Sequence, residues 1–105
     1  MILSSSAHCI QGGAQIDVEI VVPRLFCPKT ISFPDFCRGM FWISEFRLGN
    51  RESLVCGDCE VTSFERLFSQ MSHPTLESYS QIFARVKNAS ASANMFAFDI
   101  LGVCR

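Results

Sequence analysis

The sequence predicts a single α+β domain, with a small sheet and two helices packed on it. Two patterns carry this prediction. Residues 15–22 alternate apolar and polar side chains, which is typical of a half-buried strand. Residues 62–87 instead space their apolar side chains three and four positions apart, as helices do. With 105 residues, of which 49% are hydrophobic and 18% charged, the chain has the size and composition of one folded domain.

We expect residues 1–14 to form a flexible arm and residues 15–105 to form the folded domain. The arm ends in the loose stretch Gln11-Gly12-Gly13-Ala14, and it lacks the basic start and long apolar run of a signal peptide. The chain contains no run of about 18 apolar residues, so we expect no contact with a membrane. These features favour a reducing compartment inside a cell, where disulfides are rare.

Four segments are predicted to be strands. The first covers residues 15–22 and ends at Pro23, because proline cannot donate to a ladder. The second covers residues 40–48, which are rich in aromatic and β-branched side chains. The third is the short segment 52–55, and the last covers residues 95–103.

Two helices are predicted between the third and the last strand. The first begins with the capping box formed by Thr62 and Glu65 and runs to Met71. The second begins at Pro74, which suits the first position of a helix, and ends near Lys87. Residues 88–94 follow as a low-complexity linker.

Charge gives no indication of a nucleic-acid partner. The formal net charge is −1, and the nine basic residues are scattered along the chain. Binding to nucleic acid irrespective of sequence depends on clustered positive charge. We leave direct RNA binding open, because folding or formation of a homodimer could gather basic residues into one patch.

The motif with the clearest chemical implication is Cys56-Gly57-Asp58-Cys59. Zinc takes four ligands at tetrahedral corners, and two cysteines with two residues between them can fold around one ion. One such pair is half of a site. We therefore predict a structural Zn²⁺ site, a zinc knuckle beside a Pro-rich loop region.

The other two zinc ligands are expected among Cys27, Cys37 and His73. Cys27 and Cys37 lie in residues 23–38, which three prolines should keep irregular. A set of Cys27, Cys37, Cys56 and Cys59 is our first choice, and a set with His73 in place of Cys37 is the second. The competing interpretation is a bare turn at residues 56–59 without metal.

Other functional patterns are weaker. Cys56 and Cys59 also fit a dithiol redox pair, although Asp58 and Glu60 add negative charge that works against a reactive thiolate. His8, Cys9 and Cys104 would make a second metal site only if the two ends of the chain meet. No nucleophile elbow, catalytic triad, Walker loop or dinucleotide-binding glycine pattern occurs, so we expect no enzyme.

Residues 20–27 and 54–60 together resemble the small first-reading-frame proteins of sobemoviruses. The shared features are a β segment ending in a cysteine, an aromatic-rich stretch of just under thirty residues, and an apolar pair entering a Cys-x-Asp-Cys knuckle. This resemblance implies a zinc-binding suppressor of host RNA silencing that also aids viral spread. It implies Cys27, Cys56 and Cys59 as ligands. Thr30 stands where the family has a further cysteine, so the fourth ligand stays open.

The hypothesis is therefore a zinc-stabilised viral accessory protein that binds host proteins of the silencing pathway. We expect it in the cytoplasm or nucleus of the host cell, and a homodimer is compatible with the sequence. Two rivals remain. One is a thiol-disulfide oxidoreductase that uses Cys56 and Cys59, and the other is a secreted binding protein held by disulfides.

Overall fold

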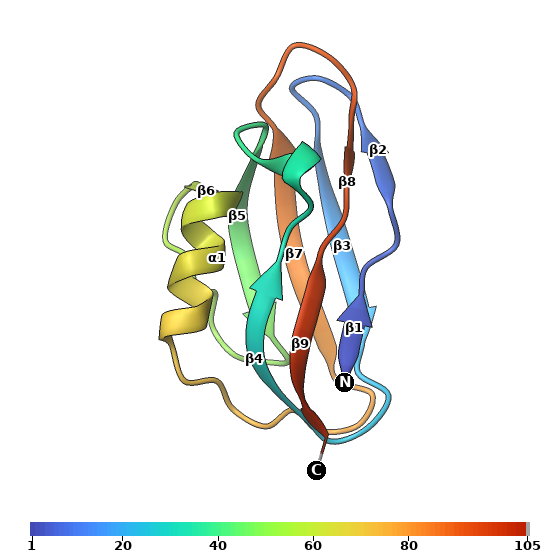
Figure 1. Cartoon of the computed structure of the whole chain (residues 1–105), viewed down its shortest axis with the longest axis vertical. Coiled ribbons are helices and arrows are strands. Elements are labelled where there is room, and N and C mark those ends of the chain that lie inside the picture. The colour runs from blue at the N-terminus through green and yellow to red at the C-terminus, as the bar shows by residue number, and fades with distance from the viewer. Residues whose placement is uncertain (105) are drawn as a thin grey trace.

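The computed structural model describes residues 1–104 and shows three antiparallel sheets arranged in two layers that pack face to face, with one α-helix at their side (Figure 1). The elements in chain order are β1 (Ile2–Ser4), β2 (His8–Ile10), β3 (Gln15–Val21), β4 (Phe26–Ser32), the 3-10 helix η1 (Asp35–Cys37), β5 (Phe41–Leu48), β6 (Cys59–Glu60), α1 (Val61–Gln70), β7 (Gln81–Asn88), β8 (Asn94–Phe96) and β9 (Asp99–Cys104). Strands make up 46% of the structure and helix 12%. The predicted α+β class with two helices is therefore wrong, because the chain folds as a β-sandwich.

The layer nearer the viewer in Figure 1, here called the front sheet, consists of the sheet β1-β9-β4 and, in line with it, the two-stranded sheet β2-β8. Only Ala97 and Phe98 separate β8 from β9. The side chains alternate inward and outward through residues 94–104 without a break, so β8 and β9 act as one long strand. The back sheet has the order β3-β7-β5-β6.

Three predicted elements are confirmed and one is partly confirmed. β3 matches the predicted first strand, β5 matches the second, and α1 matches the first helix. The predicted last strand is divided into β8 and β9. The helix cap differs from the prediction, because Glu60 is the N-cap and its carboxylate accepts from the amides of Thr62 and Ser63. Glu65 instead accepts from the amide of Phe33.

The predicted second helix is wrong, because residues 81–88 form strand β7. Its apolar residues fit a helical period, but Ile82, Ala84 and Val86 also alternate at period two and all three are buried. β7 is paired on both sides, with β3 and with β5. Pairing with these two strands makes the segment a strand instead of a helix, and neither pairing can be predicted from the local sequence.

The structure differs from the expectation in three further segments. Residues 1–14, expected to be a loose arm, contain β1 and β2, which pair with β9 and β8. Residues 23–38, expected to be irregular, contain β4, where a bulge between Pro28 and Thr30 accommodates the proline. Residues 52–55, expected to be a strand, form a loop in which the Ser53 hydroxyl accepts from the amide of Phe46.

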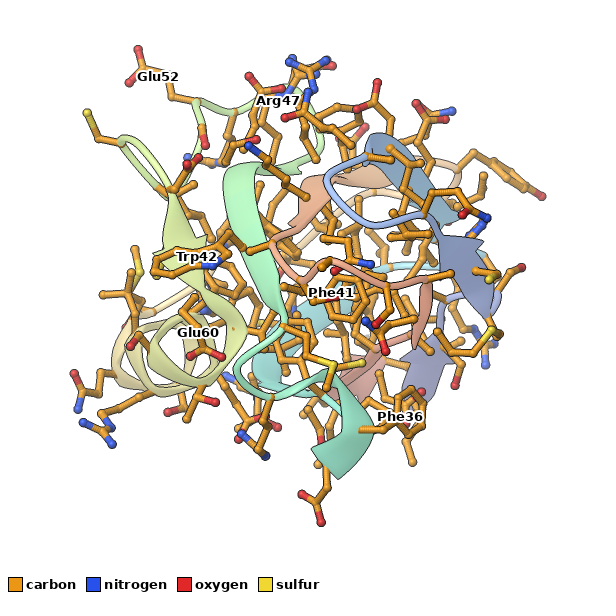
Figure 2. All side chains as sticks on the ribbon, turned by 90° about the horizontal axis from the view of Figure 1, so that it is seen from above. Phe36, Phe41, Trp42, Arg47, Glu52 and Glu60 are labelled. Carbon is orange, nitrogen blue, oxygen red and sulfur yellow. The ribbon has the colours of Figure 1, made fainter. Side chains whose placement is uncertain are left out.

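Phenylalanine fills the space between the sheets. Of the ten phenylalanines, eight are fully buried: Phe26, Phe33, Phe41, Phe46, Phe64, Phe68, Phe96 and Phe98. Their rings form a connected cluster that includes both sheets and α1, with Phe46 4.8 Å from Phe64 and Phe41 5.1 Å from Phe96. Figure 2 shows Phe41 pointing between the sheets, whereas Phe36 points away from the core.

The segment predicted as a linker is an ordered turn built around Asn88. Its side chain is buried and donates to the carbonyl oxygens of Ile10 and Ser92, each at 2.9 Å. Its Oδ1 accepts from the amide and the hydroxyl of Ser90. Asn88 therefore ties β2 to the connection between β7 and β8.

Candidate functional site

The Cys56–Cys59 knuckle forms the turn that leads into β6. Gly57 has a φ of 89°, a left-handed conformation that glycine adopts without strain. Cys56 is exposed, whereas Cys59 lies opposite Ile43 of β5 and packs partly against the core. Burial raises the pKa of the Cys59 thiol, and the neighbouring Glu60 carboxylate raises it further. Both effects disfavour the thiolate that redox chemistry and metal binding require.

The other proposed ligands make separate contacts. Cys27 is buried in β4, with its sulfur 3.6 Å from the carbonyl oxygen of His73. Cys37 is buried at the end of η1, with its sulfur 3.7 Å from the carbonyl oxygen of Met95. The His73 ring stacks on Phe68 at 3.9 Å, and its Nε2 lies 2.7 Å from the Phe68 carbonyl oxygen.

The predicted ligands therefore do not come together as a tetrahedral set. Within residues 1–104, no group of three or more histidine, cysteine, aspartate or glutamate side chains is arranged to hold a metal ion. The residues as placed do not fit the expected site, and zinc binding stays a prediction. The second site is not assembled either, because Cys9 lies in β2 and Cys104 ends β9 at the opposite end of the front sheet (Figure 1).

The outer side of the front sheet carries the exposed apolar residues that we call the apolar face: Ile2, Phe36, Met95, Leu101 and Val103. Their exposed fractions range from 44% to 62%. Ile2 lies directly opposite Leu101 in the register of β1 and β9. Phe36 and Met95 line a shallow depression of about 300 Å³ beside β8. Asp99 lies in the middle of the outward row of β8 and β9, between Met95 and Val103.

The outer side of the back sheet has the opposite character. Asp17, Arg85 and Glu45 lie side by side across β3, β7 and β5. Arg85 Nε is 2.9 Å from Asp17 Oδ1, and the Arg47 guanidinium is 3.4 Å from Glu45. Alternating charges therefore cross the middle of this face, and Val21 and Trp42 are also exposed on it, at 54% and 37%.

A second depression, of about 450 Å³, lies at one end of the charged face. Glu19, Arg47 and Tyr79 are among its lining residues. Tyr79 is 78% exposed and has a φ of 69°, a conformation that a bulky residue rarely adopts. Its amide donates to the carbonyl oxygen of Val22 at 2.6 Å, which holds this loop against the end of β3.

Sequence reasoning concentrated on the cysteines and missed both outer faces. One signal was present, because residues 1–14 contain no Asp, Glu, Lys or Arg and residues 88–104 contain only Asp99. The structure shows why this matters, since β1, β2, β8 and β9 from these two segments form most of the front sheet.

Comparison with protein-family models, with curated proteins and with solved structures finds no match. In the described part of the chain, neither α1 nor η1 has the length and apolar character needed to span a bilayer.

Proposed function

We propose that this chain is a non-enzymatic protein-binding module whose apolar face docks a partner protein. The contrast between the two outer sides of the sandwich supports the proposal. Five large apolar side chains are exposed on the front sheet and the adjoining η1, whereas the back sheet exposes Val21 and Trp42 beside a row of paired charges. Apolar side chains gathered on one surface mark sites of interaction, while single exposed ones do not.

Asp99 indicates the chemistry of the partner. Its carboxylate lies at the centre of the face, with apolar residues on both sides along the strand. A partner that covers the face must place a cation opposite Asp99, because a buried charge without a partner is costly. A second copy stacked about the middle of the face would instead bring two Asp99 carboxylates together. We therefore propose a different protein, with a Lys or Arg flanked by apolar side chains.

The face is large enough for a specific complex. The molecule measures 42 × 23 × 23 Å, and the front sheet extends along the long axis (Figure 1). A standard interface buries about 800 Å² on each partner, which a face of this length and width can supply.

The test uses two matched variants that each introduce one aspartate at an outward strand position. Leu101→Asp changes the apolar face, and Gln81→Asp changes the exposed outer side of the back sheet. A photo-crosslinking amino acid at position 101 or 81 identifies the neighbouring protein in host extract, and that protein is then purified and titrated. We expect Leu101→Asp and Asp99→Lys to weaken binding by about tenfold or more, and Gln81→Asp to bind as the wild type does.

Three outcomes would overturn this proposal. One is the absence of a crosslinked protein at position 101, and another is equal affinity for wild type and Leu101→Asp. The third is a wild-type dimer in sedimentation velocity that Leu101→Asp dissociates, because that assigns the face to a second copy.

The resemblance to the sobemoviral proteins supplies the process in which we propose that the module works, namely suppression of host RNA silencing. A silenced reporter in leaf tissue tests this step. We expect the wild type and Gln81→Asp to restore reporter expression and Leu101→Asp to fail, with equal protein levels. Full suppression by Leu101→Asp would show that the apolar face is not needed for suppression. If the wild type does not suppress silencing, the proposed role in silencing is wrong, and the binding proposal is then tested by the titration alone.

A further inference from the structure

A second surface, the free edge of β3, is independent of the apolar face. β3 pairs only with β7 among residues 1–104. One position beyond the end of β3, the amide of Val22 donates to the carbonyl oxygen of Ser80 at 2.8 Å. Because amide directions alternate along a strand, the groups that point away from β7 belong to every second residue. These residues are Gln15, Asp17, Glu19 and Val21.

The other sheet edges differ from this one. β1, β2 and β8 have three residues each, and β6 has two. β4 contains Pro28 and a bulge, and α1 packs beside it. Short strands, prolines and bulges are devices that keep an edge from pairing. β3 has none of them, because its seven residues pair with β7 in unbroken register and include no proline or glycine.

The charges beside this edge are acidic. Asp17 and Glu19 both point to the outer side of the back sheet, where Asp17 pairs with Arg85. Within residues 1–104, Glu19 has no salt bridge. Charges alternate across Glu45, Arg85 and Asp17, so a further strand beside β3 continues the alternation if it carries a cation at that position.

A second copy of the chain does not fit this edge. The antiparallel register that joins all four free residues places Asp17 opposite Glu19 twice. A shift by two residues places Asp17 opposite Asp17, or Glu19 opposite Glu19. Like charges directly opposite one another destabilise a strand pair.

We propose that the β3 edge binds an extended segment of a partner protein that carries Lys or Arg at alternate positions. The segment adds a strand to the back sheet, with backbone hydrogen bonds to Asp17 and Glu19 and with its cations beside their carboxylates. The side chains between the cations point toward the inner side of the sheet, where Val18 and Ile20 lie, so these positions are apolar.

The probe is an eight-residue peptide with lysine at two alternate positions and valine or threonine elsewhere. A matched peptide has glutamate in place of lysine. We follow titrations into ¹⁵N-labelled full-length protein by NMR. The lysine peptide is expected to shift the amide signals of Gln15, Asp17, Glu19 and Val21 and to slow their hydrogen exchange. Affinity should fall steeply between about 50 and 300 mM salt.

Glu19→Lys and Glu52→Lys make the same change of charge at two exposed positions. Glu52 projects from the loop after β5, away from β3 (Figure 2). Glu19→Lys should weaken binding of the lysine peptide about tenfold and permit binding of the glutamate peptide, while Glu52→Lys changes neither.

The assignment is overturned if the lysine peptide leaves the four amides unaffected, if the glutamate peptide binds the wild type equally well, or if Glu19→Lys binds the lysine peptide normally. In those cases Asp17 and Glu19 serve only to keep the edge from pairing. Leu101→Asp should bind the peptide as the wild type does, so failure of this proposal and failure of the apolar-face proposal are separate results.

Discussion

The guanidinium carbon of Arg47 lies 4.6 Å from the centre of the Phe83 ring, on the outer side of the back sheet. The guanidinium of Arg85 lies 5.6 Å from the same ring. Phe83 shares the outward row of β7 with Gln81 and Arg85, yet it is only 9% exposed. The two arginines therefore cover an aromatic ring that would otherwise face solvent.

A double-mutant cycle tests this cover. Arg47→Ala and Phe83→Ala should each lower the free energy of unfolding. The two changes should couple by about 0.5–1 kcal/mol, because each substitution alone removes the same cation–π contact. Urea denaturation of the single and double variants measures the coupling. Arg51→Ala, in the exposed turn after β5, is the control and should be additive with Phe83→Ala. Additivity of Arg47→Ala with Phe83→Ala would contradict the contact.

Gly102→Ala should destabilise the protein by about 1–3 kcal/mol. A methyl group at Gly102 would lie within 2.5 Å of the Phe26 ring and would also collide with the carbonyl oxygen of Cys27. Thermal and urea unfolding measure the loss. The neighbouring Leu101→Ala is the control, because Leu101 is half-exposed and its truncation should cost no more than about 0.5 kcal/mol. Equal stability of both variants is the result that speaks against tight packing at Gly102.

Asn88→Ala should cost about 2–3 kcal/mol, because it removes a buried hydrogen-bond hub and leaves the carbonyl oxygen of Ile10 without its side-chain donor. Asn50→Ala changes an exposed turn residue and should be nearly neutral. Chemical denaturation of both variants gives the comparison. A neutral Asn88→Ala would mean that water replaces the lost bonds.

Glu60→Gln should lower stability by about 1 kcal/mol at pH 7 and by less at pH 3. Partial burial disfavours the Glu60 carboxylate, but hydrogen bonds from the amides of Gly39, Thr62 and Ser63 outweigh this and lower its pKa. The folded state therefore binds this proton less readily than the unfolded chain. The resulting stability is present above about pH 4.3 and is lost as the pH falls through the folded pKa. Urea titrations at pH 7, 5 and 3 measure the trend, and a pH-independent difference would exclude it.

Cys56→Ser tests the zinc prediction. Cys56 is exposed and lies outside the core, which consists largely of buried phenylalanines. Cys56→Ser should therefore change the free energy of unfolding by less than about 0.5 kcal/mol. Elemental analysis of the purified protein and unfolding with and without a chelator complete the test. Stoichiometric zinc, with a large loss of stability on chelation and in Cys56→Ser, would show that the thiols rearrange around a metal.

The confirmed predictions concern segments whose apolar pattern fits only one type of secondary structure. β3 alternates strictly at period two, and α1 keeps helical spacing through Phe64 and Phe68. The segment that forms β7 fits both periods, and its partners in β3 and β5 are distant in sequence. β4 was missed because a proline in a strand is tolerated only at an edge or a bulge, and the position of a strand in its sheet is a property of the whole fold.

The candidate site could be predicted less well than the fold. The knuckle has the spacing of half a metal site, and Cys27 and Cys37 were candidates for the other half, but sequence does not reveal which direction each side chain points. The Cys37 sulfur is turned toward the carbonyl oxygens of Met95 and Ala97, and the Cys27 sulfur lies 3.6 Å from the backbone carbonyl oxygen of His73. The apolar face and the β3 edge depend on which strands are neighbours, and that information is absent from any single segment.

The position of β9 has a consequence for how the chain folds. β9 lies between β1 and β4, and the Met1 amine donates to the carbonyl oxygen of Gly102 at 2.9 Å, across nearly the whole chain. During synthesis, β1 and β4 both leave the ribosome long before the strand that joins them. Since closing such distant contacts is entropically slow, we expect folding on a timescale of milliseconds to seconds, with the front half of the sandwich assembling only when the final strand arrives.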